Sequence, residues 1–103
     1  MRIIARNTLQ AFWTKEPLAE EPLRAWYDEA MKATWKNPNE LKRQFGNASI
    51  VSTKRVVFNI GGNHFRLIVD IEYRLKIIFV VWVGRHGDYD KLDVRKVAYV
   101  KTN

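Results

Sequence analysis

Residues 55–73, with the sequence RVVFNIGGNHFRLIVDIEY, decide the fold of this chain. Side chains alternate in character on both sides of Gly61-Gly62, which is the pattern of strands that bury one face. Two adjacent glycines can adopt positive φ angles and therefore suit a tight loop between strands. We predict a hairpin with strands over residues 55–60 and 65–73.

An apolar run after the hairpin predicts a third strand. All residues from 77 to 83 are apolar, which is typical of a central strand covered on both faces. Gly84 is expected to end this strand. We expect a short helix over residues 88–94, with Asp88 near its N-terminus, and a last edge strand over residues 97–100.

The N-terminal part of the chain has the periodicity of helices. After a short strand over residues 2–5, one helix is expected from residue 7 or 8 to about residue 14, and a second from about residue 20 to Asn37-Pro38. Leu41 and Phe45 predict a further helical turn over the core. The order of elements predicts an α+β fold, in which two N-terminal helices pack on one face of a small antiparallel sheet, within a single domain of residues 1–103.

The composition excludes several classes of protein. Of 103 residues, 47% are hydrophobic and 28% are charged, so the chain has enough apolar residues to fold. It contains no cysteine, which excludes a disulfide scaffold, a thiolate metal site and a cysteine nucleophile. No apolar segment approaches the roughly 20 residues that span a membrane, and the N-terminus lacks the apolar core of a secretion signal. We therefore expect a cytoplasmic protein with no membrane association.

The net charge points to a negatively charged partner. Lys and Arg number 18 against 11 Asp and Glu, which gives +7. Nucleic acid is the first such partner to consider. A soluble protein with many surface lysines would have the same charge, so the charge alone leaves both interpretations open.

Polar side chains are expected to gather on one face of the sheet. The alternation in the hairpin assigns a polar set to the face opposite Phe58, Phe65 and Leu67: Arg55, Asn59, His64, Arg66 and Asp70. The third strand then leads to the densest group of ionisable residues in the chain, which are Arg85, His86, Asp88, Tyr89 and Asp90. Functional residues often lie in such loops at strand ends.

These residue types suit the cleavage of RNA. Attack of a ribose 2′-hydroxyl on the adjacent phosphorus requires a base, a cation at the phosphate and an acid for the leaving oxygen. His86 could transfer protons near neutral pH, Arg66 could hold phosphate through two N–H groups, and Tyr89 could stack on a base or donate a hydrogen bond. The residues expected to bind RNA phosphate around them are Lys54, Arg55, His64 and Arg85, and Asp88 could orient His86.

Each candidate also has a structural interpretation. His86 could simply end a strand, Tyr89 could pack a helix onto the sheet, and Arg66 could pair with Asp70 or Glu72. His64 could belong to the hairpin loop, and Asp88 could cap a helix. The histidines and carboxylates lack metal-binding spacing, so we expect neither a metal nor a cofactor.

Two segments resemble a known family. Residues 57–69, VFNIGGNHFRLIV, and residues 83–90, VGRHGDYD, are similar to the HigB-type toxins of bacterial toxin–antitoxin modules, which belong to the RelE superfamily. The resemblance implies a small sheet with two helices on one face and an endoribonuclease that cleaves messenger RNA, usually on the ribosome. It implies that Arg66 binds the scissile phosphate, that His86 and Tyr89 assist proton transfer and stacking, and that Lys54 and Arg55 contact RNA phosphate.

The resemblance also implies the partners. These are mRNA, the ribosome and a HigA-type helix-turn-helix antitoxin, with DNA contacted only through that antitoxin. Two other functions stay open. A non-catalytic RNA- or ribosome-binding module could use the same basic face, but it would need stacking aromatics there, and Phe65 and Tyr73 are expected to point away. A domain that binds an acidic protein would also fit the charge.

Overall fold

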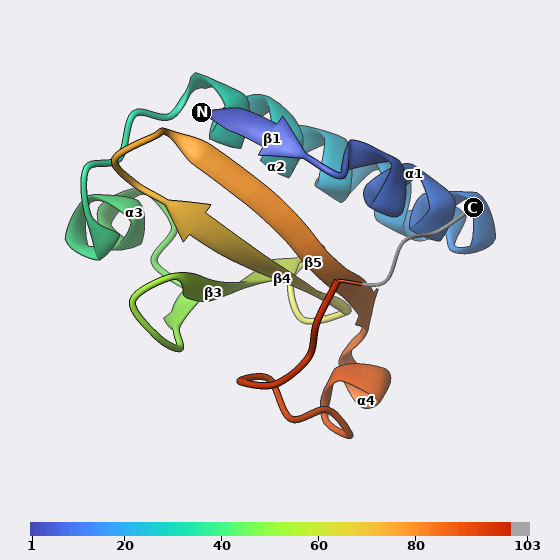
Figure 1. The fold of residues 1–103 in the computed structure, drawn as a ribbon. Helices are drawn as coiled ribbons and strands as arrows, with labels where there is room; N and C mark the ends of the chain where they lie inside the picture. Colours follow the sequence, from blue (N-terminus) through green and yellow to red (C-terminus); the bar gives the residue numbers. More distant parts are fainter. Residues whose placement is uncertain (100–103) are drawn as a thin grey trace.

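The computed structural model describes residues 1–99 and confirms an α+β fold (Figure 1). Helices α1 and α2 lie on one face of the sheet, and the segment after α4 lies on the other. In chain order the elements are β1 (Arg2–Ile4), α1 (Arg6–Lys15), a 3₁₀ turn (Pro17–Ala19), α2 (Glu20–Lys32), α3 (Pro38–Gln44), β2 (Ser49–Ile50), β3 (Arg55–Ile60), β4 (Phe65–Glu72), β5 (Ile77–Arg85) and α4 (His86–Tyr89).

The sheet has five strands in the order β1-β5-β4-β3-β2. Strands β2 to β5 are antiparallel, and the predicted glycine hairpin joins β3 to β4, with Gly61 and Gly62 both at positive φ. The opening strand β1 pairs in parallel with β5, so the sheet is mixed. A tight turn between two strands forces them to be antiparallel, but no such turn connects β1 to β5. The direction of β1 could therefore not be predicted from the sequence.

Helices α1 and α2 each bury one apolar face, which includes Leu9 and Trp13 of α1 and Leu23 and Trp26 of α2. The second helix ends at Lys32, which is earlier than predicted. Asn37-Pro38 begins α3 instead of ending α2, because the Asn37 side chain accepts a hydrogen bond from the Glu40 amide at 3.0 Å and caps the new helix. None of the helices within residues 1–99 has the length and apolar character needed to cross a membrane.

Strand β5 contains a bulge that changes which face its residues point to. Ile68 pairs with Trp82 and Val69 pairs with Val80, so Val81 is an extra residue in β5. Val81 and Trp82 therefore both lie on the face opposite the helices, which we call the far face. The prediction that Gly84 ends the strand is wrong, since β5 continues to Arg85 and Gly84 pairs with Arg66.

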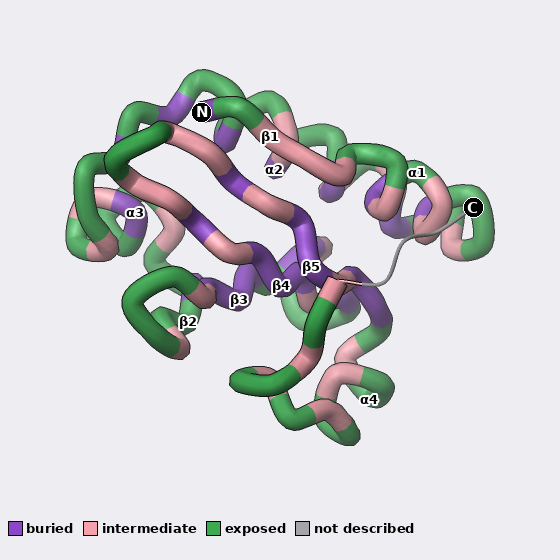
Figure 2. Tube along the Cα trace, viewed as in Figure 1, coloured by how far each residue is buried: buried purple, intermediate pink, exposed green. Residues whose placement is uncertain are grey.

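A second apolar cluster covers part of the far face. Val57, Ile68 and Val81 are buried there, and the segment after α4 packs onto them through Tyr89, Leu92, Val94 and Val97. Figure 2 shows buried residues along β3 to β5, between the helices and this segment. The predicted helix over residues 88–94 is instead the single turn His86–Tyr89. Residues 97–99 of the predicted edge strand are not a strand, and residue 100 lies outside the described chain.

Candidate functional site

Arg66, Tyr89 and Trp82 form a stack on the far face. Arg66 lies on β4, and its Cζ is 5.9 Å from the centre of the Tyr89 ring on α4, a cation–π contact. The Tyr89 ring lies 6.4 Å from the Trp82 ring at 43°. The Asn63 side chain accepts a 2.6 Å hydrogen bond from Nη2 of Arg66. The structure thus brings Arg66 and Tyr89 together from elements that are separate in sequence.

The charge of Arg66 is not neutralised by a carboxylate. Within residues 1–99 no carboxylate lies at ion-pair distance from its guanidinium. Asp70, one of the two partners that the sequence allowed for Arg66, pairs with Arg55 instead. A half-buried guanidinium without a carboxylate partner is suited to bind phosphate, because its planar donors match phosphate oxygens.

His86 lies at the end of β5 and is oriented by a carboxylate. Its backbone N–H donates to the carbonyl of His64 at 3.0 Å, and its Nδ1 lies 3.2 Å from Oδ2 of Asp90. The sequence assigned this orienting role to Asp88. Asp90 holds the position because residues four apart face one another on a helical turn, whereas residues two apart do not. The contact at Nδ1 leaves Nε2 of this partly exposed imidazole available for proton transfer.

Trp82 belongs to the stack and was not predicted. Its indole lies directly over Gly84: a Cβ atom at Gly84 would come within 2.4 Å of Cη2 of Trp82. Gly84 pairs with Arg66 across the strands, so the absence of a side chain at this position leaves room for the indole beside Arg66. An unbroken apolar run carries no alternation that shows which residues point to which face, and the bulge at Val81 is equally invisible in it.

Replacing Gly84 by alanine is expected to displace the Trp82 ring and to lower the free energy of unfolding by about 1–3 kcal/mol through overpacking. Urea unfolding measures the loss. A methyl group added at Gly46 would meet no atom of residues 1–99 within 4 Å, so Gly46→Ala serves as the matched control and should change stability by less than about 0.5 kcal/mol. The cost of Gly84→Ala should shrink in a Trp82→Leu background. An unchanged cost there would show that the indole is not the cause.

Two of the predicted cations lie at the other end of the strands. Arg55 pairs with Asp70 through two 2.8 Å hydrogen bonds, and its Nη1 donates to the carbonyls of Val94 and Val97. The hydrogen bond with Asp70 raises the pKa of Arg55. Arg55 and Asn59 are four residues apart on β3, so this pair lies about 13 Å from the row of Arg66. Arg55 is therefore occupied in holding the C-terminal segment, whereas Lys54 beside it is exposed.

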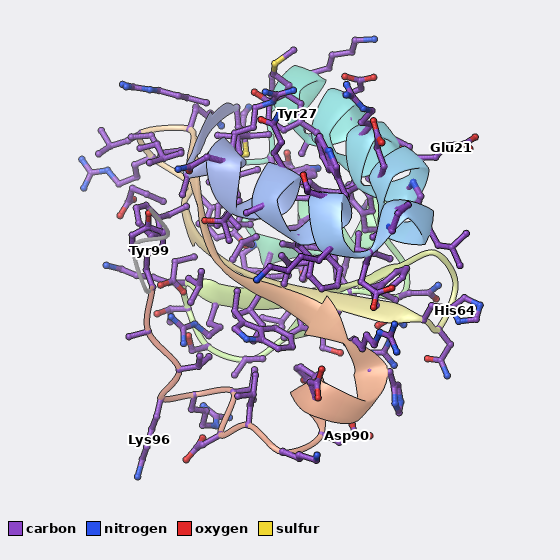
Figure 3. The ribbon with its side chains drawn as sticks, turned by 90° about the vertical axis from the view of Figure 1, so that its right-hand side faces the viewer. Glu21, Tyr27, His64, Asp90, Lys96 and Tyr99 are labelled. Carbon is purple, nitrogen blue, oxygen red and sulfur yellow. The ribbon has the colours of Figure 1, made fainter. Side chains whose placement is uncertain are left out.

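His64 and Arg85 lie beside a different hollow. Arg85 forms an ion pair with Glu16, and both line a hollow of about 470 Å³ together with His64 and Phe65. Figure 3 shows His64 at the tip of the β3–β4 hairpin and Asp90 at the end of α4. Strand alternation directs Arg85 toward the helices and Gly84 toward Arg66, so Arg85 does not join the stack.

Residues 19–92 match the family model of the HigB toxins, described as the RelE-like toxic component of a toxin–antitoxin system. The chain belongs to the HigB toxin family. It is also similar to the mRNA interferase HigB of Escherichia coli O6:H1 strain CFT073, with 29% identity over 94 residues that cover 89% of this chain and 91% of the relative. In this HigB-family toxin, the matched range contains Arg66, Trp82, His86 and Tyr89. Within the described residues, 1–99, no three His, Asp or Glu side chains are grouped to hold a metal ion.

Proposed function

We propose that this toxin is an endoribonuclease that cleaves mRNA at the patch formed by Arg66, Tyr89 and His86. The observation that carries the proposal is the guanidinium of Arg66, which lies over the Tyr89 ring with no carboxylate partner within residues 1–99. The name of the E. coli relative, an mRNA interferase, supports the same activity. His86 follows the last residue of β5 and adds an imidazole for proton transfer, which the Asp90 carboxylate orients.

The residues divide the reaction among them. The ribose 2′-oxygen loses its proton and bonds to phosphorus, while the bond from phosphorus to the 5′-oxygen breaks and that oxygen gains a proton. Arg66 binds the non-bridging oxygens and stabilises the negative charge that builds up on them. His86 provides Nε2 for one proton transfer, and the Tyr89 hydroxyl lies at the same patch for the other. The products are a 2′,3′-cyclic phosphate and a 5′-hydroxyl.

The proposal includes three partners. The mRNA is the substrate, the ribosome holds it in place, and a helix-turn-helix antitoxin neutralises the toxin and provides the only contact with DNA. Lys54 is exposed on the turn before β3 and would bind a phosphate away from the cleaved bond. We leave Arg55 out of the RNA-binding set because the Asp70 carboxylate neutralises its charge and its Nη1 is bonded to the carbonyls of Val94 and Val97.

One experiment tests the chemistry and the need for the ribosome. Purified toxin is incubated with a defined mRNA, either free or bound in the decoding site of a ribosome, and the new RNA ends are mapped. We expect cleavage only on the ribosome, with 5′-hydroxyl products, and no cleavage where the nucleotide before the cut carries a 2′-deoxy sugar. Products with 5′-phosphate ends would contradict attack by the 2′-hydroxyl. Equal cleavage of free mRNA would contradict the role of the ribosome.

A non-catalytic RNA-binding module is the second candidate. The sequence predicts few aromatic residues on the face of Arg66, whereas the structure has both Trp82 and Tyr89 on that face. Both rings are partly buried, and the faces that stay accessible beside a cation can stack on bases without cleaving RNA. Growth arrest by the toxin without any new RNA ends would favour this function.

A further inference from the structure

The hollow beside the β3–β4 hairpin is separate from the proposed cleavage patch. It measures about 470 Å³ and is lined by Glu16, Leu18, Gly61, His64, Phe65 and Arg85. The Phe65 ring is 6% exposed and contacts the Phe12 ring edge-on at 5.6 Å, which gives the hollow a rigid aromatic wall. Nothing in the cleavage mechanism uses this hollow.

Leu18 makes the hollow unusual. This leucine lies on the 3₁₀ turn Pro17–Ala19 and is 84% exposed, the highest value among the large exposed hydrophobic residues within residues 1–99. A single exposed leucine is ordinary on a protein surface. Here the exposed leucine stands at the rim of a hollow with an aromatic wall, so an apolar side chain of a partner that enters the hollow would contact both Leu18 and Phe65.

We propose that this hollow is the docking site for the antitoxin, and that it accepts an apolar side chain from an acidic segment of that protein. Membership of a toxin–antitoxin family requires that the chain binds such a partner. The net charge of +7 favours an acidic one. The rim contributes Arg85, whose present partner is the Glu16 carboxylate, so a carboxylate of the antitoxin can take the place of Glu16. This proposal rests on the pairing of toxin and antitoxin and is independent of the cleavage chemistry.

The position of Arg85 connects the hollow with the patch. Arg85 lies between Gly84, which is under the Trp82 ring, and His86, which pairs with Asp90. A partner that binds Arg85 would therefore hold the backbone directly before the imidazole.

The test uses Leu18→Asp, with Leu75→Asp as the matched control. Leu75 is 68% exposed in the turn between β4 and β5, at the other end of the sheet. Each variant is induced alone and together with the helix-turn-helix antitoxin of this toxin, and the dissociation constant of the purified pair is measured at low and high salt. We expect Leu18→Asp to arrest growth like wild type, to escape neutralisation and to bind the antitoxin at least about tenfold more weakly. Leu75→Asp should be neutralised normally.

Two results would overturn the proposal: a dissociation constant for Leu18→Asp equal to that of wild type, or an equal weakening by Leu75→Asp. If Leu18→Asp fails to fold, Leu18→Ser makes a smaller change at the same exposed position, and the same binding measurement decides. A wild-type toxin that does not cleave RNA would contradict the proposed function but would leave the binding result intact. Loss of affinity at high salt would support an acidic partner.

Discussion

Arg66→Ala is expected to lower the rate of mRNA cleavage on the ribosome by about 100- to 1000-fold, with little change in stability. The guanidinium has no carboxylate partner within residues 1–99, and its contacts are the Tyr89 ring and oxygens of Asn63 and Phe65. Its removal therefore leaves no buried charge without a partner. The loss would fall on the transition state, where negative charge builds up on the phosphate oxygens.

Two further variants make this measurement specific. Arg66→Lys keeps the charge but loses the planar pair of donors, so its rate should lie between those of Arg66→Ala and wild type. Arg74 is an exposed arginine in the turn between β4 and β5, and Arg74→Ala should cleave like wild type. Single-turnover cleavage rates and urea unfolding would be measured for all three. A wild-type rate for Arg66→Ala would remove Arg66 from the site.

Arg55→Ala is expected to lower the free energy of unfolding by about 2–4 kcal/mol. The Arg55 side chain is only 12% exposed, and it joins Asp70 on β4 to the backbone of the segment after α4. The variant would leave Asp70 and two carbonyls without their donor. The segment carries Leu92, Val94 and Val97, so its detachment would also uncover the second apolar cluster.

Urea unfolding measures this loss, and a second substitution identifies its cause. Replacing both members of the pair, Arg55→Leu with Asp70→Leu, should recover most of the stability, because no unpaired charge then remains. Arg95 lies beside the same ion pair but is exposed, so Arg95→Ala should change stability by less than about 0.5 kcal/mol. If Arg55→Ala weakened RNA binding without loss of stability, Arg55 would belong to the RNA-binding set after all.

The hairpin was predictable because its two strands alternate clearly. Phe58 and Leu67 face the helices, and Asn59 and Arg66 lie on the far face, as their spacing indicates. Strand β5 was not predictable in the same detail. Its residues are apolar on both faces, so neither the bulge at Val81 nor the direction of Trp82 leaves a trace in the sequence.

The candidate site was predictable in location and less so in its contacts. Alternation assigned Arg66 to the far face, and the structure places Tyr89 against it. The ion pair of Arg55 with Asp70 depends on strand register, and its bonds to Val94 and Val97 depend on the path of the C-terminal segment. Neither can be deduced from residue types alone. The contact of His86 with Asp90 could have been found from their i,i+4 spacing if the helical turn had been expected to begin at residue 86.

The extra residue in β5 has a genetic consequence. Val81 is one extra residue in the pairing of β5 with β4, and the bulge that it forms keeps Trp82 and Gly84 on the far face. An in-frame deletion of the codon for Val81 would remove the bulge, but it would leave Val80 opposite Val69 and Trp82 opposite Ile68. The gene could therefore lose these three nucleotides while every residue of the proposed cleavage patch keeps its face of the sheet.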